Sequence, residues 1–396
     1  MSTYSTIPAS VHKRPTPFKV DIPDGEIADF KQLLKLSRIP RETYENRQED
    51  RRFGLSRAWM INAKKIWEEY DWKKSEAHIN AFPNFTSSVT TEAGTFTTHF
   101  VALFSTSPTA APLVFLHGWP GSFQEFLPIL SLLQARFPDP ASLPYHIVVP
   151  SLPGYAFSSP PPLDREFAAR DIAVVMDQLM RDLGFEGGYI AQGGDIGSRV
   201  AKVLGGDEFP SCKAAHVNFN YLASAPAGLS TSSLSEREQV MLARGQEFVT
   251  HGSGYANMHG TRPSTIGLVL GSSPLALLAW IGEKLLAWTD EDPSLETILE
   301  SVSLYWFTRT FESSIYPYRT RFLPKDEQPV QPYVKVPFGF SNFPKELIPV
   351  PKSWAATEGN LVFYREHSKG GHFAALEQPE VLLGDIEDFV RQVWKV

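Results

Sequence analysis

Short apolar runs alternate with helical stretches through the middle of this chain, and this alternation restricts the possible folds more than any other feature. The apolar runs lie at residues 113–116, 147–149, 188–192 and 214–219. The stretches between them have helical spacing, and 167–183 forms a clear amphipathic pattern. Strands that alternate with helices form parallel sheets, because each parallel connection needs a crossover of about a dozen residues or more. The sequence therefore predicts an α/β fold with a mostly parallel central sheet.

The alternation stops near residue 220 and resumes after residue 324. Between these positions the chain has helical stretches, many aromatic residues and no strand pattern. Strand patterns return at 333–340 and 361–364, and a last helix is expected at 379–394. We therefore expect a helical lid inserted into the α/β core, since pockets of such folds lie at the C-terminal edge of the sheet.

The overall charge argues against some classes of partner. The 396 residues carry 44 acidic and 37 basic side chains, a net charge of −7 at pH 7. This balance disfavours nucleic acid or an anionic membrane surface as a partner. Cys212 is the only cysteine, so no intrachain disulfide can form, and a reducing compartment, the cytoplasm, is the expected location.

One segment has the length of a membrane span. Residues 263–282, PSTIGLVLGSSPLALLAWIG, carry no charge over twenty positions. They also contain three glycines, two prolines, three serines and a threonine, which favour a buried segment that lines a pocket. The first twenty residues have no apolar core of signal-peptide length. We therefore expect no membrane anchor.

The stretch GGYIAQGGDIGSRV, residues 187–200, has the outline of a catalytic turn between a strand and a helix. Glycines flank Asp195 on both sides, as a sharp turn requires, because larger side chains there would clash. Hydrolases with such a turn usually carry serine at its centre. Asp195 could instead be a simple helix N-cap, a position that aspartate favours. This motif alone does not decide between the two interpretations.

A second motif, HGWPGS at residues 117–122, follows the predicted strand 113–116. In α/β-hydrolases a backbone N–H from the loop at this place joins the N–H that follows the nucleophile to form the oxyanion hole. Trp119 would supply the first donor and Ile196 the second. The bond between Trp119 and Pro120 is a candidate cis peptide, since such bonds are almost confined to proline.

His372 is the histidine best placed to act as a base, because it lies in KGGHFAALEQPE between the last predicted strand and the last helix. Triad residues of this fold occur in the order nucleophile, acid, base. Glu346, directly after PFGFSNF, is the best placed acid in the interval where one is expected. The other acids there are Asp326, Glu327 and Glu358. Among the histidines His367, five residues before His372, is the nearest competitor.

A carboxylate at the turn indicates which kind of carbon it attacks. A serine that attacks a saturated carbon would form an ether, whereas a carboxylate forms an ester that water can cleave. His372, oriented by Glu346, could then activate that water. The residues therefore indicate an alkyl substrate with a leaving group, either an epoxide or a haloalkane.

The leaving group distinguishes these two substrates. Opening an epoxide develops an alkoxide, which needs acidic O–H donors such as tyrosine, whereas a departing halide needs only weak N–H donors. Four tyrosines of the predicted lid could supply these donors, although a tyrosine in such a segment is more often a packing residue. They are Tyr255, Tyr305, Tyr316 and Tyr318.

Seven motifs, taken in order, make the chain resemble the microsomal-type epoxide hydrolases, most closely their soluble fungal members. They are PFKVDIPDGEIADFKQLLKLSRIP, HGWPGSF, GGDIGS, GSGYANMHGTRPSTIG, SIYPYR, FGFSNFPKE and GGHFAALE. The set spans residue 17 to the end of the chain. The motifs HGWP and Gly-Asp alone are shared with other hydrolases, so the specificity lies in the ordered set.

The resemblance implies an α/β-hydrolase fold with an inserted helical lid and an N-terminal meander. The expected division is residues 1–94 for the meander, 95–220 for the first part of the core, 221–324 for the lid and 325–396 for the second part of the core. Mammalian microsomal members have an N-terminal membrane anchor, and nothing like it is evident in this sequence, so we expect a soluble enzyme.

Carried over to this sequence, the resemblance implies Asp195 as the nucleophile, His372 as the base and Glu346 as its charge partner. Many relatives have aspartate where Glu346 stands, and the extra methylene could change how His372 is held. The resemblance also implies Tyr255 and Tyr318 as donors to the epoxide oxygen. Spacing does not separate Tyr318 from its neighbour at position 316.

The expected reaction is hydrolysis of an epoxide to a vicinal diol without metal or organic cofactor. The aromatic-rich lid suggests apolar or aryl substrates, and a role in detoxification is part of the same expectation. The sequence leaves the oligomeric state open, a homodimer being one option. The alternatives are a haloalkane dehalogenase, which usually has tryptophan where Ile196 follows the nucleophile, and a non-catalytic ligand-binding protein, which often lacks a triad member.

Overall fold

The computed structural model describes residues 3–222 and 224–395 and contains a nine-stranded sheet. The strands are β1 (Thr16–Phe18), β2 (Asn84–Thr91), β3 (Gly94–Leu103), β4 (Ala111–Leu116), β5 (Tyr145–Pro150), β6 (Tyr189–Gly193), β7 (Cys212–Val217), β8 (Val334–Asn342) and β9 (Gly359–Glu366).

The sheet combines an antiparallel edge with a parallel centre. Its spatial order is β1-β2-β3-β5-β4-β6-β7-β8-β9. The pairs β1–β2, β2–β3 and β3–β5 are antiparallel, and all pairs from β5–β4 to β8–β9 are parallel. The predicted α/β fold with a mostly parallel sheet is therefore confirmed.

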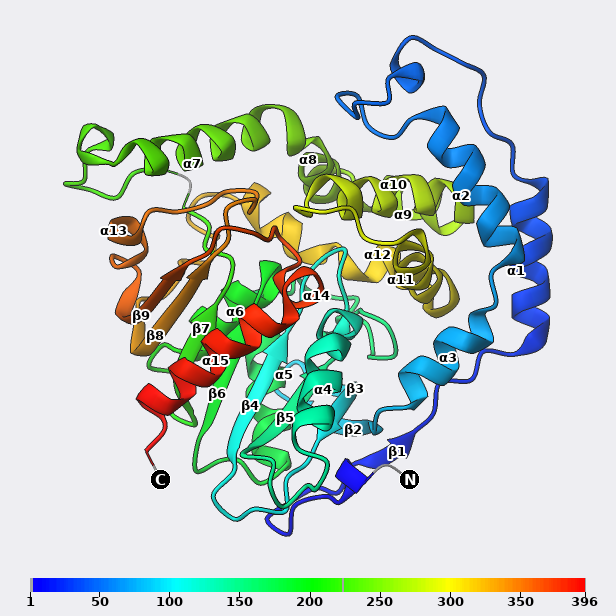
Figure 1. Ribbon diagram of the computed structural model, residues 1–396. Coiled ribbons are helices and arrows are strands. Elements are labelled where there is room, and N and C mark those ends of the chain that lie inside the picture. Colours follow the sequence, from blue (N-terminus) through cyan, green and yellow to red (C-terminus); the bar gives the residue numbers. More distant parts are fainter. Residues whose placement is uncertain (1–2, 223, 396) are drawn as a thin grey trace.

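Helices surround this sheet in three groups (Figure 1). The N-terminal group comprises α1 (Asp24–Leu36), α2 (Arg57–Glu69) and α3 (Trp72–Asn80). The core group comprises α4 (Leu127–Arg136), α5 (Ala169–Asp182), α6 (Asp195–Leu204), α13 (Lys352–Ala355), α14 (Ala374–Glu377) and α15 (Pro379–Val393). The lid group comprises α7 (Glu236–Glu247), α8 (Gly254–Thr261), α9 (Pro263–Gly271), α10 (Pro274–Ala287), α11 (Leu295–Thr308) and α12 (Phe311–Ser314). Shorter helical turns are η1 (Thr3–Ser5), η2 (Glu45–Arg47), η3 (Phe123–Phe126), η4 (Thr231–Ser233), η5 (Phe248–Gly252) and η6 (Tyr316–Phe322).

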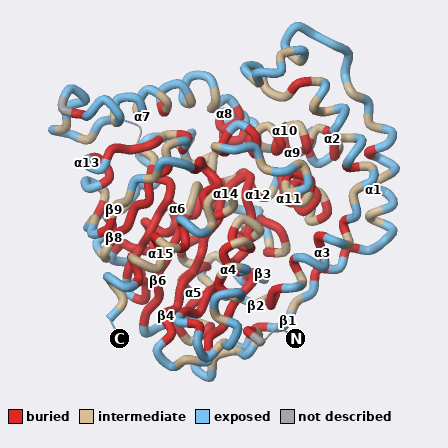
Figure 2. Tube along the Cα trace, in the orientation of Figure 1, coloured by how far each residue is buried: buried red, intermediate tan, exposed pale blue. Residues whose placement is uncertain are grey.

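The central strands are buried on both faces because helices cover both sides of the sheet. In Figure 1, α4 and α15 lie in front of the strands, whereas α5 and α6 lie behind them. All residues of β4, β5 and β6 are buried, which explains why the sequence shows them as continuous apolar runs rather than as alternating patterns. The same strands form the buried centre of the molecule in Figure 2.

The lid consists of helices in the part of it that the structure describes. The uncharged segment predicted to line a pocket becomes two helices, α9 and α10. Over the described residues no single helix is long and apolar enough to cross a membrane, and α9 and α10, which pass that test only together, bend by 116° at their junction. The inward face of α10 is apolar, with Leu277, Leu278 and Ile281 buried.

Two features differ from the sequence-based expectation. The helical stretch between the first two apolar runs begins with the 3-10 turn η3, and α4 starts only at Leu127, with a proline in its first turn. Strand β2 and helix α3 were not predicted. The sequence of β2, NFTSSVTT, is rich in small polar residues, and pairing with β3 makes it a strand. The expected boundary at residue 94 falls in this β2–β3 hairpin.

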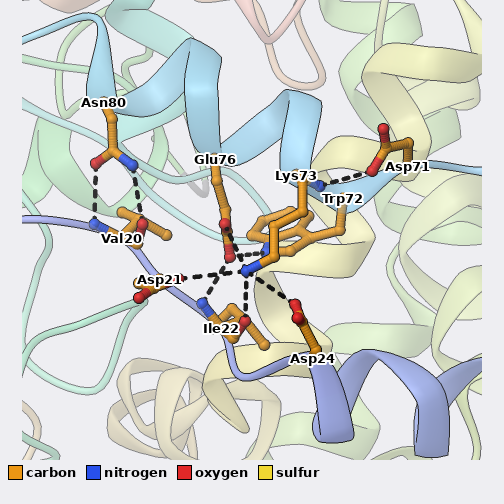
Figure 3. Close-up of polar contacts among 9 residues, drawn as sticks. All are labelled: Val20, Asp21, Ile22, Asp24, Asp71, Trp72, Lys73, Glu76 and Asn80. Atoms are coloured by element: carbon orange, nitrogen blue, oxygen red, sulfur yellow. Dashed lines mark hydrogen bonds and ion pairs between the residues drawn. The ribbon is translucent and has the colours of Figure 1, made fainter.

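Glu76 on α3 fixes the segment that leads into α1 (Figure 3). Its carboxylate is buried and accepts hydrogen bonds from the backbone N–H of Ile22 at 2.6 Å and from Trp72 Nε1 at 2.9 Å. It also pairs with Lys73 at 3.0 Å, and the Lys73 ammonium donates to the Ile22 carbonyl at 2.7 Å. One side chain therefore satisfies several buried donors at once.

The same region connects the sheet edge to the lid. Asn80 closes a pair of hydrogen bonds with the N–H and C=O of Val20, at 2.9 and 2.8 Å (Figure 3). On the other side, Trp67 Nε1 of α2 donates to Ser303 Oγ of α11 at 2.8 Å. The N-terminal helices therefore hold the lid helix α11 in a fixed position relative to β1.

We predict that Glu76→Ala lowers the free energy of unfolding by about 3 kcal/mol, because it leaves the Ile22 and Trp72 donors buried without an acceptor. Glu76→Gln should lose clearly less, since its amide oxygen still accepts. Equilibrium urea denaturation followed by tryptophan fluorescence measures both.

The matched control is Asp24→Ala. The Asp24 side chain is 93% exposed and lies 3.5 Å from the Lys73 ammonium, so its loss should leave the urea midpoint almost unchanged. Equal destabilisation by Glu76→Ala and Asp24→Ala would contradict the role assigned to the buried acceptor.

Candidate active site

Strand β6 passes into helix α6 through a turn that requires glycine on both sides. A Cβ atom at Gly193 would lie 2.2 Å from the carbonyl oxygen of Gly197, and a Cβ at Gly197 would lie 2.1 Å from the carbonyl oxygen of Leu116. Between them Asp195 adopts φ 46°, a left-handed conformation that residues other than glycine rarely take. The turn therefore projects the Asp195 carboxylate beyond the C-terminal end of β6.

Asp195 does not act as a helix cap. Gly194 is the N-cap residue of α6, and no side chain caps this helix. The carboxylate instead accepts a hydrogen bond from the backbone N–H of Trp119, with 2.8 Å between the nitrogen and Oδ1. A Cβ at Gly118 would lie 2.1 Å from that oxygen, so Gly118 leaves the space that the carboxylate occupies. The peptide bond between Trp119 and Pro120 is cis, as the sequence suggested.

The pKa of the Asp195 carboxyl is lower than usual. Burial alone would raise this pKa, but the hydrogen bond and charge of His372 and the backbone N–H groups of Trp119 and Ile196 outweigh the cost of burial. Both N–H groups expected to form an oxyanion hole thus act on this carboxyl group, which is ionised at neutral pH.

His372 lies between two carboxylates. Its Nδ1 is 2.6 Å from Glu346 Oε1, and its Nε2 is 3.3 Å from Asp195 Oδ2. The imidazole and the Glu346 carboxylate are almost fully buried, at 1% and 2% exposed. Burial opposes protonation of the imidazole, but the negative charges of Glu346 and Asp195 and the hydrogen bonds to them raise the pKa of His372 well above its usual value.

Two competing candidates for these roles are engaged elsewhere, and the other two, Asp326 and Glu327, are exposed. His367 Nε2 lies 2.6 Å from Asp385 Oδ2, which also accepts from Ser341. Glu358 pairs with the buried ammonium of Lys202 at 2.8 Å. The structure therefore brings together Asp195, His372 and Glu346, the three side chains that the motif order had singled out.

Two of the four lid tyrosines face this group. The rings of Tyr255 and Tyr318 are 5.7 Å apart and nearly perpendicular, and Tyr255 stacks on Trp119 at 5.4 Å. Burial and the negative charge of Asp195 raise the pKa of both phenols, which keeps them protonated as donors. The other two hydroxyls donate to backbone carbonyls: Tyr305 to Gly121 at 2.9 Å and Tyr316 to Pro153 at 3.0 Å.

Aromatic rings close the space around Trp119. His259, Trp288 and Phe311 all pack against its indole, and Trp288 also packs against His372. The Trp288 carbonyl accepts the backbone N–H of His372 at 2.9 Å. The role of Trp288 could not be predicted from local patterns, because its partners lie far along the chain.

A cavity of about 220 Å³ opens between α1 and the lid. Acidic side chains and Arg309 lie at one end, and the remainder of the lining is largely aromatic and aliphatic. These lining residues include Phe30, Leu277, Tyr305, Trp306, Phe307 and Phe311. Phe311 of this lining also contacts Trp119, but none of the triad side chains lines the cavity. Over the described residues, no three side chains of His, Cys, Asp or Glu are grouped as a metal site.

A carboxylate on a strand-to-helix turn, backed by a histidine and a second carboxylate at the C-terminal edge of a mostly parallel sheet, defines an α/β-hydrolase. Comparison with known proteins agrees. Residues 15–126 match the family described as Epoxide hydrolase N terminus, and residues 111–217 match the alpha/beta hydrolase fold. The structure of Aspergillus niger epoxide hydrolase is similar, with 52% identity and a TM-score of 0.93 over 99% of this chain and 100% of that chain.

Two further relatives show the same relationship at the level of sequence. A protein of Dothistroma septosporum is 44% identical over 397 residues, which are 98% of this chain and 93% of that protein. Epoxide hydrolase 1 of Oryctolagus cuniculus is 32% identical over 415 residues, which are 94% of this chain and 88% of its own length. The chain therefore belongs to the epoxide hydrolase family, as its motifs had indicated.

We predict that Asp195→Asn lowers the pKa of His372, because it removes one of the two negative charges that stabilise the imidazolium. A lower pH should then be needed to protonate the ring, which NMR titration of ¹⁵N-labelled histidine detects. Asp207→Asn is the control, since it removes an exposed carboxylate paired with Lys335. A titration of His372 that responds equally to both changes, or to neither, would contradict the geometry described above.

Proposed function

We propose that this protein hydrolyses epoxides to vicinal diols through a covalent ester on Asp195. The observation that carries the proposal is the carboxylate held by the Trp119 N–H, with the imidazole of His372 on one side and the phenols of Tyr255 and Tyr318 nearby. Membership of the family supports the same activity.

In the first step, an oxygen of the Asp195 carboxylate attacks a saturated ring carbon and the C–O bond of the epoxide breaks. The released oxygen takes a proton from one of the two phenols, and the second phenol donates a hydrogen bond to it. Because Tyr316 already donates to the Pro153 carbonyl, Tyr318 is the better second donor.

In the second step, His372 takes a proton from water, and the oxygen of that water attacks the carbonyl carbon of the ester. The N–H groups of Trp119 and Ile196 would hold the tetrahedral oxyanion. Collapse expels the diol oxygen, which takes the proton from His372. The restored Asp195 acid gives its proton back to the tyrosinate, so the sum is epoxide plus water to diol, and neither step needs a metal or organic cofactor.

A haloalkane dehalogenase is the less favoured alternative. Two phenols facing the nucleophile suit a developing alkoxide and are superfluous for a halide, and Ile196 stands where a halide-binding tryptophan would be expected. The aromatic rings packed around Trp119, whose N–H holds the nucleophile, support apolar or aryl epoxides as substrates. A cytoplasmic location agrees with the single cysteine, Cys212, which is buried and free.

We predict that the wild type converts an aryl epoxide to its diol and releases no halide from a matched alkyl halide. Asp195→Ala should abolish turnover because no ester can form. His372→Gln should open the ring but leave the ester uncleaved, so that mass spectrometry finds the Asp195 peptide heavier by the mass of the epoxide. Halide release without diol, or no adduct in the His372 variant, would refute the proposed reaction.

The tyrosines provide a second prediction. Tyr255→Phe and Tyr318→Phe should each slow ring opening about a hundredfold, because one of two acidic donors is lost. Tyr316→Phe is the matched control, since its hydroxyl donates to a backbone carbonyl, and it should retain most of the single-turnover rate measured by rapid quench. A large loss of the ring-opening rate with Tyr316→Phe and none with Tyr318→Phe would assign the donor role to Tyr316 instead of Tyr318.

A further inference from the structure

The HGWPGSF loop surrounds a second carboxyl group, that of Glu125, which has no role in the steps above. The space beside Gly121 is filled by this side chain, since a Cβ at Gly121 would lie only 1.3 Å from Glu125 Oε1. The space beside Gly118 is filled in the same way by Asp195 Oδ1. Two glycines of one short loop therefore make room for two different carboxyl groups.

Both carboxyl groups retain accessible surface within buried surroundings. The Asp195 side chain is 18% exposed, and Glu125 is also partly exposed. The neighbouring Trp119, Ser122 and Tyr305 are buried. Among the described residues, no side chain donates a hydrogen bond to the Glu125 carboxyl group. The Glu125 carboxyl group therefore keeps acceptor sites that no described side chain uses.

His372 supplies the third observation. Its Nε2 is buried, and the contact that it makes with Asp195 Oδ2, at 3.3 Å, is long. Once Asp195 is an ester, this nitrogen must hold the water that cleaves it. A water with two hydrogens needs a second acceptor if its lone pair is to point at the ester carbonyl.

We propose that Glu125 is this second acceptor, so that His372 and Glu125 together hold and orient the hydrolytic water. The inference rests on the proposed two-step reaction and assigns Glu125 to its second step. His372 takes one hydrogen of the water, Glu125 accepts a hydrogen bond from the other, and the oxygen lone pair attacks the ester carbon.

The charges around Glu125 agree with this role. Burial raises the pKa of Glu125 to about 8; the charge of His372 opposes this rise, the charge of Asp195 adds to it, and the Ser122 N–H opposes it. The other titratable groups coupled to Glu125 are the phenols of Tyr155 and Tyr305. In the free enzyme at pH 7 Glu125 is therefore mostly neutral and adds no second anion beside the nucleophile.

Formation of the ester changes this balance. Asp195 loses its charge, which removes one cause of the raised pKa of Glu125, and the neutral imidazole that acts as base no longer opposes that rise. As a carboxylate, Glu125 is the stronger acceptor for water and a counter-charge for the imidazolium that His372 forms. Ester cleavage should therefore accelerate with pH through two ionisations, that of His372 and that of Glu125.

The test compares Glu125→Leu, which removes the acceptor, with Glu125→Gln, whose amide oxygen still accepts but does not titrate. Single-turnover reactions with an aryl epoxide measure ring opening by rapid quench and ester cleavage by the decay of the Asp195 adduct. Glu125→Leu should leave ring opening within about threefold and slow ester cleavage about tenfold or more, so that the adduct accumulates. Glu125→Gln should keep most of the cleavage rate at pH 7 but show only one of the two ionisations in its pH profile, that of His372.

Gln124→Leu is the control on the same turn, because its amide donates to Glu300 at 3.0 Å, and both rates should stay near the wild-type values. Equal slowing of both steps by Glu125→Leu, or an unchanged pH profile in Glu125→Gln, would overturn the inference. If Glu125→Leu does not fold, the pH profile of Glu125→Gln decides alone. A wild type that forms no Asp195 ester would refute the proposed function itself, whereas an ester that decays normally in both variants would refute only the role of Glu125.

Discussion

The close approach of β6, α6 and β4 at the Asp195 turn is the constraint on which the rest of the site depends. A Cβ atom at Gly193 or Gly197 would lie 2.2 or 2.1 Å from a backbone carbonyl oxygen, so no other residue could occupy either position without moving the neighbouring backbone. The left-handed conformation of Asp195 costs about 1–3 kcal/mol. The hydrogen bond from Trp119 and the interaction with His372 offset that cost. The strained turn is therefore maintained by the same contacts that position the carboxylate.

The electrostatics follow from this geometry. One imidazole lies between two carboxylates, and a third carboxyl group, Glu125, lies on the neighbouring loop. The site tolerates several acids because their surroundings differ: backbone N–H groups and His372 keep the pKa of Asp195 low, whereas burial keeps the pKa of Glu125 high. Acids whose pKa values are pushed apart can perform different tasks within one site. The difference between the pKa values of Asp195 and Glu125 therefore agrees with different roles for the two groups in the reaction.

Much of this arrangement could be predicted from the sequence because it depends on local patterns. Continuous apolar runs predicted β4, β5 and β6, and glycines around Asp195 predicted the turn, since each feature reflects a steric need of a few adjacent residues. Motif order predicted that His372 and Glu346 would meet Asp195.

Features that depend on distant partners could not be predicted in this way. Strand β2 is polar and is recognisable only through its pairing with β3. The contact between Trp288 and His372 joins the lid to a core loop. The position of Glu125 beside Gly121 depends on how the 3-10 turn η3 folds back on the loop before it. The local sequence GSFQEF contains no pattern that predicts this conformation.

Trp119 couples the two halves of the site. Its backbone N–H holds the nucleophile of the core, while its ring stacks on Tyr255 of the lid. The distance between the nucleophile and the phenols therefore depends on how the lid packs against one core residue. The N-terminal helices restrain that packing, because Trp67 bonds to Ser303 of α11 and Phe30 packs against Phe307 of the same helix. The N-terminal helices thus lie outside the site and still contribute to its geometry, since a lid free to shift on Trp119 would carry the proton donors away from the carboxylate.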